Sequence, residues 1–389
     1  MSQTLWQPPR LRRDEDNEHE RRATWLELFY DLVFVAAIGE LAHYLSLNLN
    51  WRGVGSYIAF FIPIWLCWLG ATFYATRFDT DDLSDRLASL FQMAIVAAMA
   101  VNIHAGLTDA SLEFAICYLL FRVLLILQHL NAGYHVPEVR GLTTIYALGF
   151  GAGATFWLIS LFVPLPWRVG FWVVGMGLDL ATPFMATKWV TQFPPSMTHI
   201  PERVGLFTII VLGESIVAVV RGLSEHDWGV LSIVGALLGL SVAFSLWWLY
   251  FDSVDGSPLQ AIKDGNVRMA MGWVYAHMPL AIGLTTMGVG VERMVTNGVD
   301  LTPSTADRWL FCGSVALCLC LLSTIHWVTS TLGHPHVHRI VGSYRLGSAA
   351  FVGVLAIAPT SLNSLTLIAL VAIACAVQVG LDLYRYSAL

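Results

Sequence analysis

Long apolar runs recur from residue 24 to the end of this chain. A helix needs about 20 apolar residues to cross the hydrocarbon core of a bilayer, which is about 30 Å thick. Charged residues make up only 12% of the sequence, whereas soluble domains carry about 25%. The sequence therefore predicts an all-α, polytopic membrane protein with about twelve transmembrane helices. The expected spans are 24–48, 54–76, 86–107, 110–132, 141–163, 167–189, 203–222, 228–251, 267–292, 307–331, 340–358 and 363–385.

The order of the runs also predicts the domain organisation. We expect a polar cytoplasmic tail at 1–23, an N-terminal six-helix repeat at 24–190, a cytoplasmic linker at 191–201 and a C-terminal six-helix repeat at 202–389. Short segments recur in corresponding spans and in the same order, which indicates a duplication. The matches pair Gly39–Glu40 with Gly213–Glu214, Phe78–Asp79 with Phe251–Asp252, Tyr146–Gly149 with Tyr344–Gly347 and Gly177–Leu180 with Gly380–Leu383. Because six is even, both repeats would enter the membrane from the same side, as in transporters built from parallel repeats.

The basic residues predict an orientation for these spans. With the N-terminus taken as cytoplasmic, the inner tails and loops hold 15 lysines and arginines and the outer loops hold 5, while Arg122 falls inside a span. Cytoplasmic loops of membrane proteins carry an excess of Lys and Arg. We therefore expect both termini to face the cytoplasm.

The first span carries an unusual number of ionisable residues. Glu27 and Asp31 are four residues apart and so share one helix face. Glu40 falls on the opposite face, together with His43. An ionisable group in hydrocarbon is costly unless it is paired or hydrated, so this helix should lie in the interior of the bundle. For Glu27 the alternative is an ordinary acid in the first helical turn, where the helix dipole favours it.

Three other spans carry charges near the middle of the membrane. By helix rise, Arg122 lies about 16 Å from the outer surface and Glu214 about 16 Å from the inner surface. We therefore expect Arg122 to pair with Glu214, or failing that with Glu40, either as a static pair or as one whose partner changes during a transport cycle. Asp179 lies four residues before Pro183, which should weaken the helix there and free carbonyl groups.

Two further residues complete the set of candidates. His277 lies near the middle of its span and is either a hydrogen-bonded core residue or a proton-coupling one. Asp382, the repeat counterpart of Asp179, should be solvated near the cytoplasmic end. The predicted substrate-binding, ion-binding or proton-coupling residues are Glu27, Asp31, Glu40, His43, Arg122, Asp179, Glu214 and His277.

The sequence lacks the motifs that are typical of several kinds of enzyme. It has no phosphate-binding glycine-rich loop, no HExxH, no GxSxG and no CxxC. We therefore predict no catalytic residue, no cofactor and no metal site. The six cysteines should be buried free thiols. No basic stripe with interleaved aromatic residues indicates nucleic-acid binding.

Two segments resemble a known family. The run Arg22–Val35 (RATWLELFYDLVFV) resembles the opening signature of the bacterial low temperature requirement A family. The run Pro201–Phe207 (PERVGLF), continuing to Leu212–Ser215 (LGES), is similar to the second signature of that family. The resemblance covers essentially the whole chain. It implies a multi-pass protein of the bacterial inner membrane and assigns no biochemical activity.

These patterns favour one function and leave others open. The first hypothesis is a secondary transporter or ion-coupled permease with a polar site between the two halves, in which protons or a cation balance the excess of acidic residues. The alternatives are a cation channel with acidic residues in its pore and an intramembrane enzyme acting on a lipid or lipid-linked group. We lean against the enzyme. The expected partners are the bilayer and a proton or cation; the substrate and the oligomeric state are open.

Overall fold

The computed structural model describes residues 6–12, 24–79, 82–108, 111–224, 229–252, 257–330, 335–358 and 361–387. Most of the predicted tail, 1–5 and 13–23, lies outside these ranges. The helices are α1 (Trp25–Leu47), α2 (Trp51–Arg77), α3 (Leu83–Val101), α4 (Ser111–His135), the 3₁₀ helix η2 (Pro137–Val139), α5 (Arg140–Ser160), α6 (Trp167–Met185), α7 (Thr187–Gln192), α8 (His199–Ser224), α9 (Val230–Phe251), α10 (Ser257–Gln260), α11 (Val267–Thr296), α12 (Thr305–Ser330), α13 (Pro335–Ile357) and α14 (Ser364–Ser387).

Each predicted span contains a long helix. Within the described ranges, ten helices are long and apolar enough to cross a membrane. The long helices α1 and α6 are not among the ten. The acidic residues of α1 are Glu27, Asp31 and Glu40, and α6 contains Arg168, Asp179 and the internal proline Pro183. The protein is thus an all-α, multi-pass membrane protein.

The apolar surface of the helices agrees with a lipid environment. Large apolar side chains lie exposed on many helices, among them Phe91, Leu120, Leu148, Val220 and Val354. A soluble protein rarely exposes so many large apolar side chains. In a bilayer the lipid tails cover such side chains.

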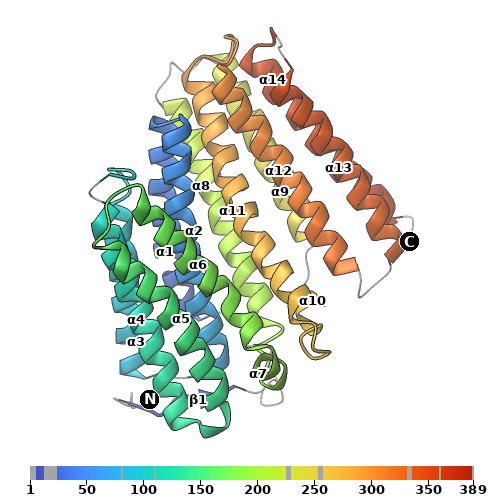
Figure 1. The fold of residues 1–389 in the computed structure, drawn as a ribbon. Helices are drawn as coiled ribbons and strands as arrows, with labels where there is room; N and C mark the ends of the chain where they lie inside the picture. Colours follow the sequence, from blue (N-terminus) through green and yellow to red (C-terminus); the bar gives the residue numbers. More distant parts are fainter. Residues whose placement is uncertain are drawn as a thin grey trace. The chain divides into compact units, whose positions relative to one another are not determined.

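The chain divides into two compact units. Unit 1 comprises Met1–Leu41, Gly55–Leu206 and Leu259–Met271, and unit 2 comprises Ala42–Val54, Phe207–Pro258 and Gly272–Leu389. In unit 1, α5 packs along both α4 and α6, and α3 packs on α4 (Figure 1). In unit 2, α12 packs along α13, and α9 along α14.

A short ladder attaches the N-terminal segment to unit 1. The strands β1 (Arg10–Leu11) and β2 (Phe78–Asp79) are antiparallel, with Arg10 opposite Asp79 and Leu11 opposite Phe78. The Arg12 amide also donates to the Arg77 carbonyl at 2.9 Å. Because β2 lies between α2 and α3 in the chain, the ladder holds the N-terminal segment beside the ends of these two helices.

The start of α1 is set by a capping box. The Thr24 amide donates to Glu27 Oε2 at 2.7 Å, and the Glu27 amide donates to Thr24 Oγ1 at 3.2 Å. This reciprocal pair satisfies two amides that the first helical turn would otherwise leave without partners. By fixing where α1 begins, the capping box fixes the positions from which the side chains of Glu27 and, one turn later, Asp31 project.

Candidate functional site

A buried cluster of charged residues lies at the N-terminal ends of α1 and α8. Arg203 Nη2 donates to Asp31 Oδ1 at 2.6 Å, and Arg203 Nη1 lies 3.4 Å from Glu27 Oε1. Asp31 and Arg203 are both fully buried, at 0% and 2% exposure. One guanidinium thus serves two carboxylates one helical turn apart, as the predicted shared face of Glu27 and Asp31 allows.

The carboxylate of Asp31 has only part of its hydrogen-bonding capacity filled. Trp68 Nε1 of α2 donates to Asp31 Oδ1 at 2.8 Å, the same oxygen that accepts from Arg203. Asp31 Oδ2 and Arg203 Nε are buried and have no hydrogen-bond partner in the part of the chain that the structure describes. Buried polar atoms are normally paired; Asp31 Oδ2 can accept a hydrogen bond or a proton, and the Arg203 Nε–H can donate a hydrogen bond.

His199 links this cluster to a third carboxylate. Its Nε2 lies 3.2 Å from Glu27 Oε1, and its Nδ1 lies 3.2 Å from Glu202 Oε2. A neutral imidazole has one N–H and can donate to only one of them. Both contacts are favourable only if the imidazole is protonated or if one of the two carboxyl groups holds a proton. A proton on the imidazole would let His199 donate to both carboxylates at once.

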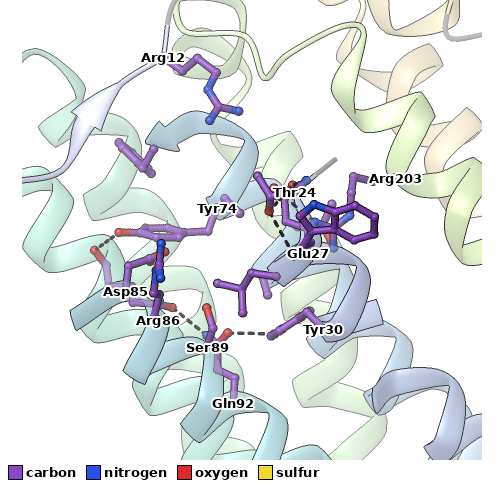
Figure 2. A pocket seen from close by; sticks show the side chains of 17 residues that line it. Arg12, Thr24, Glu27, Tyr30, Tyr74, Asp85, Arg86, Ser89, Gln92 and Arg203 are labelled. Carbon is purple, nitrogen blue, oxygen red and sulfur yellow. Dashed lines mark hydrogen bonds and ion pairs between the residues drawn. The ribbon is translucent and has the colours of Figure 1, made fainter. Parts of the chain in front are cut away.

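A cavity of about 410 Å³ adjoins the cluster within unit 1. Glu27 and Arg203 form part of its wall, and Asp85 and Arg86 of α3 lie across it (Figure 2). Arg12, which the N-terminal ladder holds in place, also lines it. The volume falls in the usual range for small-molecule sites, about 300–1,000 Å³.

One wall of the cavity is a chain of uncharged polar groups. The Tyr30 hydroxyl donates to Gln92 Oε1 at 2.9 Å, and Gln92 Nε2 donates to Gln128 Oε1 at 2.9 Å. The Tyr74 hydroxyl donates to the Gln128 carbonyl at 3.3 Å. These residues come from α1, α2, α3 and α4, so the wall ties four helices together and offers hydrogen bonds to a polar ligand.

The partner of Arg122 differs from the predicted one. Arg122 Nη2 lies 3.0 Å from Asp179 Oδ2, and the Tyr118 hydroxyl bridges the two by donating to Asp179 at 2.7 Å and accepting from Arg122 Nε at 2.8 Å. The expected pairing of Arg122 with Glu214 is therefore wrong. Helix rise gives only the depth of a residue and says nothing of the direction in which its side chain leaves the helix.

The predicted solvation of Asp382 is also wrong. Asp382 is 1% exposed, and Arg345 Nη2 of α13 donates to it at 2.6 Å within unit 2. Asp179 and Asp382, which the sequence pairs as repeat counterparts, thus each meet a buried arginine.

The remaining predicted residues lie in other surroundings. Glu40 is partly exposed and lies 2.9 Å from His104 Nε2, away from the Arg203 cluster. His43 and Glu214 are half-buried members of unit 2. His277, also in unit 2, is buried, with its Nδ1 2.8 Å from the Trp273 carbonyl. The structure therefore brings together Glu27 with Asp31, and separately Arg122 with Asp179.

Sequence reasoning missed two members of the cluster. Arg203 begins the predicted span 203–222 and is one of the 15 basic residues counted on the cytoplasmic side, and His199 lies in the predicted linker. The available signal was the second family-like segment, which contains Glu202 and Arg203.

Within the described residues no group of three or more His, Cys, Asp or Glu could hold a metal ion. The six cysteines are free.

Comparison with known proteins places these residues in a wider context. A family model described as Bacterial low temperature requirement A protein (LtrA) matches residues 22–380. A protein of Rhizobium meliloti (strain 1021), described as Uncharacterized protein RA0937, is 25% identical over 304 residues, which cover 74% of this chain and 73% of that protein. No solved structure matches. Both halves of the Arg203 cluster lie inside the family match.

Proposed function

This chain belongs to the bacterial low temperature requirement A family, and we propose that it is a proton-coupled secondary transporter whose coupling site is the cluster of Glu27, Asp31, His199 and Arg203. The observation that carries the proposal is the position of His199 between two carboxylates. Ionisable groups inside a membrane protein commonly mark proton pathways, and imidazole changes its charge near neutral pH.

The composition of the cluster supports a cycle of proton binding and release. Glu27, Asp31 and Glu202 face one arginine and one histidine. When His199 is protonated, these five groups together hold one excess negative charge, which a second proton or a cation would neutralise. Asp31 Oδ2 is a buried oxygen that could take it up. Loading and unloading would then change the charge that Arg203 must balance.

The cluster also joins the two predicted repeats. Asp31 and Glu27 lie in α1, the first helix of the N-terminal repeat, and Arg203 lies in α8, the first helix of the C-terminal repeat, although all three belong to unit 1. We propose that α1 and α6 cross the bilayer together with the ten strongly apolar helices, giving twelve spans in two parallel repeats. The four pairs of matching segments in corresponding spans support that duplication.

The proposed location is the bacterial inner membrane, with both termini in the cytoplasm. The excess of lysine and arginine on one side of the predicted spans supports this orientation. It puts the Arg203 cluster near the cytoplasmic surface. Glu214 remains a proposed coupling residue further along α8.

The test is uptake by proteoliposomes under an imposed pH gradient. Radiolabelled solutes of four classes (a carboxylate, phosphate, an amine and a sugar) are offered to the wild type and to Asp31→Asn and Glu214→Gln. We expect the gradient to drive saturable uptake of one class, and Asp31→Asn to abolish the dependence on the gradient. Glu214→Gln should reduce the dependence of uptake on the gradient.

Two outcomes would contradict the proposal. If uptake by the wild type does not depend on the pH gradient, transport is not coupled to protons. Single-channel current steps in a planar bilayer, without saturation, would favour a cation channel instead.

A further inference from the structure

We propose that Arg77, at the C-terminal end of α2, binds a phosphate group, carried by a membrane lipid or free in solution. This site is separate from the proposed coupling cluster, and the inference does not depend on transport. It is carried by a buried guanidinium whose Nε–H and Nη2–H groups have no acceptor among the described residues.

The guanidinium of Arg77 is buried without a counter-charge. Arg77 is only 3% exposed, and its Nε and Nη2 atoms have no hydrogen-bond partner in the part of the chain that the structure describes. Among the described arginines, the three that are more deeply buried each pair with an aspartate: Arg122, Arg203 and Arg345. Arginine stays protonated in proteins, and an uncompensated buried charge is strongly destabilising. An anion from outside the chain would supply the missing partner.

Aromatic rings hold this guanidinium in place. Its Cζ lies 5.7 Å from the ring centroid of Phe73 and 5.4 Å from that of Tyr146 on α5. Tyr146 is itself stacked on His129 of α4, with 5.4 Å between the ring centroids. Cation–π contacts attract the charge to the rings but provide no oxygen acceptor for its N–H groups. These groups remain available for a phosphate, which matches the planar fork of arginine in geometry.

Asp82, five residues further along the chain, does not neutralise Arg77. Its carboxylate accepts from the Gln7 amide at 2.6 Å and from the Asp85 amide at 2.8 Å. These bonds cap α3 and attach the N-terminal segment. The Asp82 carboxylate is therefore engaged with amides and not with the guanidinium of Arg77.

A second basic residue lies at the same end of these helices. Arg140 begins α5 and is exposed, and its Nε donates to the Gly133 carbonyl of α4 at 3.2 Å. Gly133 is one turn beyond His129 on α4, and Arg140 lies about 9 Å before Tyr146 on α5 by helix rise. Basic pockets between transmembrane helices near the membrane surface bind phosphate-containing headgroups. The end of α2, α4 and α5 offers such a pair of positive charges.

The position of Arg77 in its span suits a lipid headgroup. Arg77 is the last residue of α2, which has 27 residues and is apolar enough to cross a membrane. A helix of this length extends about 40 Å, beyond the hydrocarbon core of about 30 Å. The neighbouring helices α4 and α5, which pack along each other (Figure 1), expose Leu130 and Leu148. Acyl chains can lie against such side chains while a phosphate reaches the end of α2.

The experiment is thermal unfolding of the delipidated full-length protein in dodecyl maltoside micelles that contain rising mole fractions of phosphatidylglycerol. A ligand that binds the folded state raises the unfolding midpoint. We expect phosphatidylglycerol to raise the midpoint of the wild type. A galactosyl diacylglycerol with the same acyl chains, which lacks phosphate, should leave it unchanged. Arg77→Gln should bind phosphatidylglycerol about tenfold or more weakly, because it loses a charge-assisted contact.

The matched control is Arg52→Gln. Arg52 lies on the same helix, is exposed and is the second residue of α2, so this variant removes the same charge from the opposite end. It should bind phosphatidylglycerol as the wild type does. Arg77→Lys keeps the charge but not the fork, and it replaces Arg77→Gln if that variant does not fold. It should bind about threefold or more weakly than the wild type.

A parallel titration with inorganic phosphate identifies the source of the phosphate group. Stabilisation by inorganic phosphate that is lost in Arg77→Gln would assign the site to free phosphate. Stabilisation by phosphatidylglycerol alone, again lost in Arg77→Gln, would assign it to a lipid headgroup. Either result supports the site.

Three results would refute the site. The first is that neither phosphatidylglycerol nor inorganic phosphate stabilises the wild type. The second is that the Arg77 variants respond to both probes as the wild type does. The third is that Arg77→Gln and Asp79→Asn lower the midpoint equally in lipid-free micelles, which would make the counter-charge of Arg77 a carboxylate of its own chain.

Discussion

Arg203 is the residue on which the buried cluster depends. It is the guanidinium partner of Asp31, which is fully buried and also accepts from Trp68. A buried ion pair adds little net stability, but removal of one partner leaves an uncompensated charge in a medium of low dielectric constant.

We expect Arg203→Gln to lower the free energy of unfolding by about 3–5 kcal/mol, the cost of breaking a buried pair from one side. Asp31→Asn should cost less, and the double variant Arg203→Gln/Asp31→Asn should lose less than the sum of the two, because no charge is left unpaired. Denaturant titration in detergent micelles measures the three values. Glu40→Gln, on the same helix with a partly exposed partner, should change stability by no more than about 1 kcal/mol. Additive losses would show that Arg203 and Asp31 are not coupled.

At the scale of helices, the close approach of α5 and α6 depends on glycine. A Cβ on Gly175 would lie 2.7 Å from Trp157 Cδ1 and 3.0 Å from the Gly153 carbonyl. Trp157 in turn stacks on Trp172 with 4.7 Å between ring centroids. The contact leaves no space for a Cβ, because the neighbouring atoms belong to the backbone and to a ring that is held between two helices.

We therefore expect Gly175→Ala to destabilise the protein by about 1–3 kcal/mol, as overpacking of a core does. Gly177 lies on the same helix, and a Cβ added there would meet no neighbouring atom within 4 Å. Gly177→Ala should therefore be neutral or stabilising by up to about 1 kcal/mol through helix propensity. Thermal unfolding midpoints of the two variants provide the comparison. Equal losses at both positions would mean that the α5–α6 contact is looser than described.

Attachment of the N-terminal segment should depend on acidity. Asp82 caps α3 by accepting from the Asp85 amide at 2.8 Å and also accepts from the Gln7 amide at 2.6 Å. Burial acts to raise the pKa of the Asp82 carboxyl, but these hydrogen bonds outweigh it and hold the pKa below its ordinary value. A lowered pKa in the folded state stabilises the attachment above the unfolded value of about 4. That stabilisation is lost as the pH falls through the folded value.

We expect amide exchange in residues 6–12, corrected for the intrinsic rate, to rise as the pH falls below about 4. Asp82→Ala should show the faster exchange already at neutral pH. Exchange that is unchanged in Asp82→Ala would mean that the β1–β2 ladder alone holds the segment.

Across the whole molecule, the sequence predicted the helices better than their partners. Apolar runs locate the helices because their length and composition reflect the bilayer, and the spacing of Glu27 and Asp31 predicted their shared face. The ion pairs of Arg122 and Asp382 were not predictable, since depth along a helix leaves the direction of the side chain undetermined. Arg203 was missed because counting basic residues near span ends places them in water, whereas this arginine is buried.

The measurement that tests the coupling site most directly is infrared difference spectroscopy of the purified protein between pH 8 and pH 5. If the Glu27–Asp31–His199–Arg203 cluster binds a proton, the wild type shows a protonated-carboxyl band on acidification that is missing from Glu27→Gln/Asp31→Asn. Glutamine at 27 preserves the capping box, and Glu40→Gln serves as the control that should retain the band. The same band in the wild type and in the double variant would contradict the assignment of the proton to this cluster.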